Sequence, residues 1–110
     1  MNEHEAWDSV QHYDDRVRVT RWDVPVGAVI AEHTHGHDYV VVPLVDGTMG
    51  ITPRGGEPFT SQVHAGVSYA REAGASHTVA NAGDQHLAFV EVELLDTDTG
   101  ETASKLSASA

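Results

Sequence analysis

Short runs of alternating apolar and polar residues make up most of the chain between residues 16 and 95. Successive side chains of a strand point to opposite faces of a sheet, so this period of two is typical of strands buried on one face. After the first dozen residues, no stretch of ten or more residues has apolar side chains at helical spacing. The pattern predicts eight strands, at residues 16–24, 28–35, 39–45, 48–52, 59–64, 68–71, 77–80 and 87–95.

Turn-forming residues separate these segments. Pro-Val-Gly at 25–27, Asp-Gly at 46–47, Pro-Arg-Gly-Gly at 53–56 and Asn-Ala-Gly-Asp at 81–84 combine the fixed φ of proline with the positive φ that glycine allows. Many short strands between explicit turns are typical of an all-β sandwich or barrel. We therefore expect a single β domain over residues 15–95.

The two ends of the chain differ from this central part. Residues 1–14 mix charged side chains with Trp7 and Tyr13 and are expected to form an N-terminal arm, either a short helix or a segment that packs on the barrel. Residues 96–110 are small and polar, and they carry too little apolar surface to offset the entropy of ordering. The sequence therefore predicts a flexible polar tail over 96–110.

Length and composition restrict the possible sources of stability. A chain of 110 residues can form one domain with a modest core. It has no cysteine, which excludes disulfides, zinc fingers and thiol nucleophiles. A metal ion or a second subunit remains. With a small core and an exposed sheet edge, we expect a homodimer.

The charge balance restricts the partners. The formal net charge is −11, from 17 acidic and 6 basic residues, and it should repel phosphate backbones and anionic membranes. No apolar run approaches the roughly 20 residues of a membrane span, and the first residues do not resemble a signal peptide. We expect a cytoplasmic protein that binds a small molecule, with neither nucleic acid nor membrane as a partner.

The histidines offer the clearest candidate chemistry. His33 and His35 are two positions apart at the end of a predicted strand, so both imidazoles share one face, with Cα atoms roughly 6.6 Å apart. That spacing suits two ligands of one ion, and a third ligand must come from a distant segment. His77 begins another alternating segment, which fits an inward-facing imidazole. The alternative is a hydrogen-bonded polar cluster without metal.

Two longer spacing patterns surround these histidines. One runs from Gly27 through His33 and His35 to Gly47, and the other consists of Gly66, Glu72, Gly74, His77 and Asn81. Together they resemble the two motifs of the cupin family over residues 15–95, and residues 37–44 further resemble small one-domain cupins linked to β-alanine degradation. The resemblance implies a double-stranded β-helix, or jelly roll, and assigns metal ligation to His33, His35 and His77.

One departure from the family pattern affects the chemistry. With the motif spacing, the glutamate that cupins use as a further ligand falls on Val40, whose side chain is expected to face the ion. Three neutral imidazoles would leave the ion its full double charge and several open coordination positions. Such three-histidine sites occur in cupins that resemble diketone-cleaving and thiol dioxygenases.

Nearby side chains are candidates for a catalytic or substrate-binding role. Asp38 and Glu72 could restore a carboxylate, although Asp38 is more typical of a turn residue and Glu72 fits an exposed loop equally well. The direction of His37 is not determined, because Gly36 interrupts the strand. Tyr39 is a further catalytic candidate, and together with Tyr69 and Arg71 it could orient a substrate.

These observations predict a metal-dependent, dioxygenase-like enzyme acting on a small carbonyl or carboxylate compound. Each chain is expected to bind one divalent ion, Fe(II) by preference, although the same ligands also suit Zn, Mn or Ni. Two alternatives stay open: an isomerase or decarboxylase that uses the ion as a Lewis acid, and a non-enzymatic module that binds a small ligand or metal.

Overall fold

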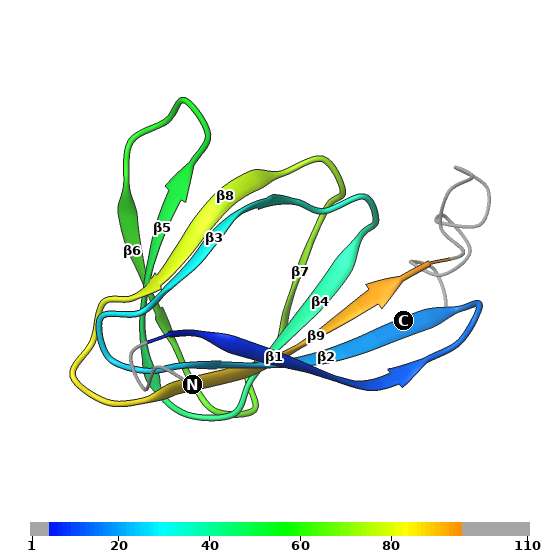
Figure 1. The fold of residues 1–110 in the computed structure, drawn as a ribbon, viewed down its shortest axis with the longest axis horizontal. Helices are drawn as coiled ribbons and strands as arrows, with labels where there is room; N and C mark the ends of the chain where they lie inside the picture. Colours follow the sequence, from blue (N-terminus) through cyan, green and yellow to red (C-terminus); the bar gives the residue numbers. More distant parts are fainter. Residues whose placement is uncertain (1–4, 96–110) are drawn as a thin grey trace.

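The computed structural model describes residues 5–95, which fold into two antiparallel β-sheets (Figure 1). The five-stranded sheet has the order β1-β2-β9-β4-β7, and the four-stranded sheet has the order β3-β8-β5-β6. The strands are β1 (Trp7–Tyr13), β2 (Val17–Val24), β3 (Val29–Thr34), β4 (Tyr39–Pro43), β5 (Gly47–Pro53), β6 (Phe59–Val63), β7 (Tyr69–Arg71), β8 (Ser76–Asn81) and β9 (Leu87–Leu94).

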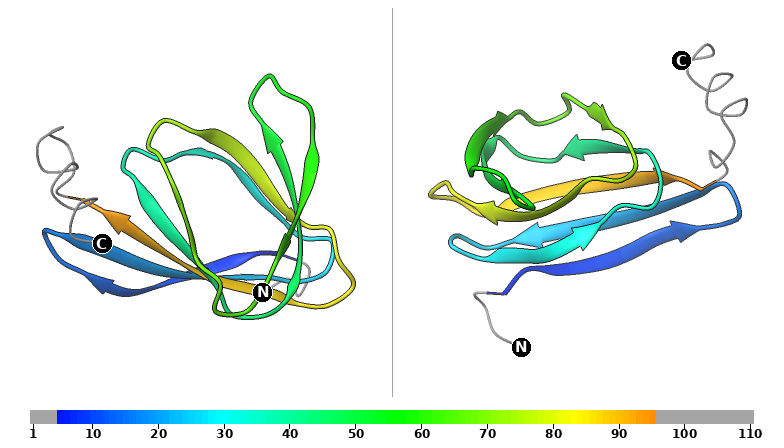
Figure 2. Two further views of the ribbon diagram at one scale, coloured as in Figure 1. Left: turned by 180° about the vertical axis from the view of Figure 1, so that it is seen from behind. Right: turned by 90° about the horizontal axis from the view of Figure 1, so that it is seen from above.

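The eight strands expected from the alternating pattern are confirmed, with ends shifted by one or two residues. The pairing of β3 with β8, β4 with β7 and β5 with β8 joins segments distant in the chain, as a double-stranded β-helix requires. Figure 2 shows from two further sides how the sheets close around one interior. The predicted all-β jelly roll is therefore correct. The described part of the chain forms no helix of membrane-spanning length and apolarity.

The expected N-terminal arm forms strand β1, an outer strand of the five-stranded sheet that pairs with β2 from Trp7 to Tyr13. All seven of its residues are exposed, including the aromatic side chains at both ends. An edge strand with one neighbour has little tertiary burial, so its apolar content gave no clear signal in the sequence. The predicted tail, residues 96–110, lies outside the described residues.

The core forms where the inner faces of the two sheets meet. Phe89 and Leu87 on the central strand β9 are almost completely buried, and Val24 on β2 and Pro43 on β4 join them. On β4 the buried residues alternate strictly, at Tyr39, Val41 and Pro43. This alternation fixes which side chains face the interior and therefore which can form a site inside the barrel.

Asn81 connects the end of β8 to two other segments. Its side chain, 4% exposed, donates hydrogen bonds to the carbonyl oxygens of Val24 at 2.8 Å and Gln85 at 2.7 Å, and it accepts one from the Gly83 amide at 3.0 Å. The asparagine of the second motif therefore stabilises the fold by satisfying backbone groups where β2, β8 and the 81–86 turn meet.

Asn81→Ala is expected to lower the free energy of unfolding by about 2 kcal/mol, because it leaves buried backbone groups without partners. Urea denaturation of the metal-free protein measures this cost. Thr60→Ala, at an exposed position on β6, is the control and should change stability by less than about 0.5 kcal/mol. An Asn81 variant as stable as the control would contradict this structural role.

Candidate metal centre

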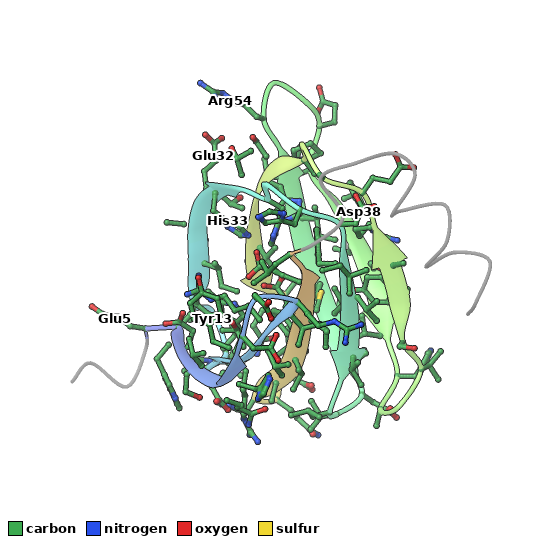
Figure 3. All side chains as sticks on the ribbon, turned by 90° about the vertical axis from the view of Figure 1, so that its right-hand side faces the viewer. Glu5, Tyr13, Glu32, His33, Asp38 and Arg54 are labelled. Carbon is green, nitrogen blue, oxygen red and sulfur yellow. The ribbon has the colours of Figure 1, made fainter. Side chains whose placement is uncertain are left out.

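Two neighbouring strands and the turn after one of them bring the three histidines together. His33 on β3 is paired directly with His77 on β8, and a register shift between Ile30 and His33 precedes this pair. His35 follows the last residue of β3. In Figure 3, His33 lies at the same end of the barrel as Glu32, Asp38 and Arg54. The site is therefore at the rim of the barrel, where the strands give way to loops.

The loop between β7 and β8 fixes the backbone of His35. The His35 amide donates to the Ala75 carbonyl at 3.2 Å, and the His35 carbonyl accepts from the Gly74 amide at 2.8 Å. Gly74 has a φ of 99°, a left-handed conformation that residues with a side chain rarely adopt. The glycine of the second motif thus allows the loop to hold a histidine of the first motif.

The imidazole nitrogens are spaced as ligands of one ion would be. One ligand nitrogen from each of the three histidines lies within 4.8 Å of the other two. The Nε2 atoms of His33 and His35 are 2.9 Å apart. Two nitrogens that each bind one metal at about 2.1 Å, with a right angle between the bonds, are separated by roughly 3.0 Å. The arrangement therefore fits a divalent metal ion.

Contacts behind the rings orient them for this role. His33 Nδ1 lies 2.9 Å from the Ala31 carbonyl oxygen, and donation there places the lone pair of the ring on Nε2. The ring of His35 stacks on Tyr39, with centroids 3.9 Å apart and planes at 22°. Contacts made by the side of the ring away from the metal hold metal-binding histidines in one tautomer and one orientation.

The electrostatic environment keeps two of these imidazoles neutral. Burial, followed by the nearby His33 and His77, lowers the pKa of His35 from 6.5 to about 4. Burial also lowers the pKa of His77, with His33 and Arg71 adding to the effect. Imidazole must be neutral to bind a metal, so at neutral pH these rings are ready to coordinate without first losing a proton.

Glu91 on β9 is a carboxylate of the site that the sequence analysis missed. Its Oε2 lies 3.9 Å from His35 Nε2, and its side chain is only 13% exposed. Burial, followed by the charge of Glu93, raises the pKa of Glu91 from 4.5 to about 7, although a hydrogen bond from Trp22 opposes the shift. A signal was present in the sequence, because Glu91 has the same strand parity as Phe89 and so faces the interior.

Two hollows adjoin the histidines. A cavity of about 40 Å³ inside the barrel is lined mainly by apolar and aromatic side chains, with His77, Glu91, Tyr69 and Arg71 as its polar members. An outer groove of about 280 Å³ is lined by His33 and His35, and also by Arg18 and Glu91. Glu91 lines both hollows, whereas His77 lines the inner cavity and His33 and His35 line the outer groove.

The expected inward direction of Val40 is wrong. On β4 the buried residues are Tyr39, Val41 and Pro43, and Val40 lies on the alternate face. Tyr39 and Val41 line the inner cavity. The turn 36–38 makes β4 begin with Tyr39 facing the interior. Because successive residues of a strand face opposite sides, Val40, the position of the motif glutamate, then faces outward.

Val40→Glu is therefore expected to leave metal affinity unchanged within about twofold, since its carboxylate would not point toward the three histidines. Isothermal titration of the metal-free variant with Zn(II) tests this. A clear gain in affinity over the wild-type protein would show that residue 40 reaches the site after all.

The structure places the remaining candidates around the rim. Asp38 accepts a hydrogen bond from the Ala73 amide at 2.8 Å, so it anchors the loop that holds His35. Glu72 is exposed on that loop, and His37 is partly buried. Among residues 5–95, the group of side chains spaced to bind a metal contains His33, His35 and His77, and none of these three candidates. Arg71 lies over the Tyr69 ring, 4.5 Å from its centroid.

Comparison with known proteins agrees with this architecture. The chain is 43% identical over 90 residues to the β-alanine degradation protein BauB of Pseudomonas aeruginosa, which covers 82% of this chain and 94% of that protein. A crystal structure of a cupin domain from Bordetella pertussis matches with a TM-score of 0.79 and 40% identity, over 86% of this chain and 97% of that one. A double-stranded β-helix protein from Klebsiella pneumoniae shares the fold, with a TM-score of 0.71 and 22% identity over 90% and 84% of the two chains.

The family model for the cupin domain matches residues 20–93, which include all three histidines and every strand except β1 and the outer ends of β2 and β9. The spacing of glycines and histidines, the jelly roll and the sequence relatives therefore lead to one conclusion: this chain belongs to the cupin family.

Proposed function

We propose that this cupin is a metal-dependent enzyme of the dioxygenase type that acts on a small carbonyl or carboxylate compound. The observation that carries the proposal is the convergence of three imidazole nitrogens within 4.8 Å of one another beside a cavity in the barrel. His33, His35 and His77 would hold the ion, with Fe(II) as our first choice. When bound, the ion would supply Lewis acidity and a position for dioxygen or a chelating oxygen group.

The chain's own residues would bind and orient the substrate. The inner cavity of about 40 Å³ limits the group that enters it to a few heavy atoms. Its wall is mainly apolar, and Arg71 offers a cation to a substrate carboxylate. Tyr39 and Tyr69 hold their protons at neutral pH as any phenol does, and burial raises the pKa of both still further, that of Tyr39 to about 12. Both can therefore donate hydrogen bonds.

The relative from Pseudomonas aeruginosa is named for β-alanine degradation. We propose that this chain serves the same process and takes a short acid as substrate. A short carboxylate with a 3-oxo or 3-amino group suits the small cavity and the nearby Arg71. The panel of test compounds should accordingly centre on β-alanine, 3-oxo acids, β-diketones and thiol acids.

The test is anaerobic purification, metal analysis and reconstitution with one equivalent of Fe(II), followed by oxygen-uptake measurements with that panel. We expect uptake with at least one short acid and its loss in a His77→Ala variant. An Fe(II)-loaded protein that consumes no oxygen with any member would contradict the dioxygenase assignment. Turnover of a panel compound without oxygen uptake would instead indicate an isomerase or decarboxylase.

A further inference from the structure

The site has no carboxylate at the position where the cupin motif would place one. On β4 the inward position next to His35 holds Tyr39, and Val40 lies on the other face. Glu91 on β9 is paired with Val41 of β4, so its side chain faces the same interior as Tyr39 and Val41. A neighbouring strand therefore supplies a carboxylate to the space that the motif position leaves without one.

The distance between Glu91 and His35 is compatible with one shared ion. Glu91 Oε2 lies 3.9 Å from His35 Nε2. Two donor atoms that each bind the same metal at about 2.1 Å can be at most roughly 4.2 Å apart. Among residues 5–95, the donor atoms within 4.8 Å of one another are those of the three histidines, so the Glu91 side chain would have to turn toward His33 and His77 to join them. Glu91 also lines both the inner cavity and the outer groove. His77 lines the inner cavity as well, and His33 and His35 line the outer groove.

The surroundings of Glu91 favour a cation at this place. Its side chain is 13% exposed, and its ion-pair contact is with the imidazole of His35 and with no lysine or arginine among the contacts of residues 5–95. Glu93, two residues further along the same strand, instead faces the Arg18 guanidinium at 4.0 Å. A buried carboxylate is costly without a compensating charge, and a divalent ion between Glu91 and the histidines would supply one.

We propose that Glu91 is the fourth protein ligand of the metal centre, contributed by β9 in place of the motif position on β4. This inference rests on the metal site proposed above. Glu91 would reduce the net charge of the loaded site from +2 to +1 and leave fewer coordination positions for water and substrate than three histidines alone.

The test compares Glu91→Gln with Glu93→Gln, which removes the same charge two residues away on the same face of β9. Co(II) is the probe, because its visible absorption reports the ligand set and its affinity can be measured by competition with a chelating dye. We expect Glu91→Gln to weaken Co(II) binding at least tenfold and to change the absorption spectrum. Glu93→Gln should keep the spectrum and stay within about threefold of the wild-type affinity.

Glutamine has nearly the same volume as glutamate and can still accept the hydrogen bond from Trp22, and circular dichroism verifies folding. If Glu91→Gln does not fold, Glu91→Asp serves instead: the shorter carboxylate should bind Co(II) more weakly and with a changed spectrum. A Glu91→Gln or Glu91→Asp protein with the wild-type spectrum would overturn the proposal. Wild-type protein that binds no Co(II) would overturn both this proposal and the metal centre, whereas an unchanged variant leaves the three-histidine site standing.

Discussion

Replacing His77 with alanine is expected to reduce bound metal from one ion per chain to less than about one-tenth of that. His77 comes from β8, whereas His33 and His35 come from β3 and the residue after it. Without His77 the ion would lose the histidine ligand from the second strand and, with it, the geometry that two adjacent ligands cannot impose alone. Altering a residue that only hydrogen-bonds to a metal ligand typically weakens metal binding 10- to 100-fold, and losing one of three imidazole ligands should weaken it more.

Elemental analysis after reconstitution with Zn(II), together with calorimetric titration, measures this loss. His64→Ala is the matched control, because His64 is well exposed and lies 4.0 Å from Asp46, away from the three histidines. The control should retain one equivalent of metal. If His77→Ala still binds one equivalent with wild-type affinity, His77 is not a ligand.

Glu91→Gln is expected to stabilise the metal-free protein at pH 8 by up to about 3 kcal/mol and to have little effect at pH 4. The folded pKa of Glu91 is about 7, above its ordinary value of 4.5. Its contribution to stability is therefore fully present below about pH 4.5 and is lost as the pH rises through about 7. The size follows from roughly 1.4 kcal/mol per pKa unit.

The pKa of His35 shifts in the opposite direction, so its effect on stability must be separated from that of Glu91. Its folded pKa of about 4 lies below the ordinary 6.5, so its contribution is present above about pH 6.5 and is lost as the pH falls through about 4. The two dependences oppose each other in the wild-type protein. Glu91→Gln removes the first and leaves that of His35, to which the lowered pKa of His77 adds in the same direction. Urea denaturation of chelator-treated protein between pH 4 and 8 resolves them. A variant that is less stable than wild type at pH 8 would show that Glu91 is a structural residue.

The period-two pattern predicted the strands well because each one buries a single face. Leu87 and Phe89 on β9 illustrate this, since both are apolar, two residues apart and almost completely buried. The histidines were also identifiable, because the motif glycines serve a structural purpose that sequence spacing preserves. Gly74 adopts a left-handed turn and bonds to the backbone of His35.

The carboxylate of the site was harder to identify. The motif spacing assigned position 40 to the interior, and a single residue of difference in the turn 36–38 reversed the face of the strand. Glu91 was overlooked because it is 56 residues from His35 in the sequence and no motif connects them. The pairing of β9 with both β2 and β4 places it there, and such long-range pairings are not encoded in local spacing.

The central claim, that three histidines form a metal centre on the folded barrel, is tested most directly by melting metal-loaded and chelator-treated protein at pH 7.5 and pH 4.5. A metal that binds only the folded state stabilises it by RT ln(1 + [L]/Kd), about 2.7 kcal/mol at a hundredfold excess over Kd. The loaded protein should therefore melt at a higher temperature at pH 7.5, and the two curves should converge at pH 4.5, where protons compete for the imidazole nitrogens. Identical melting temperatures at pH 7.5, with elemental analysis finding no metal in either sample, would contradict the metal centre.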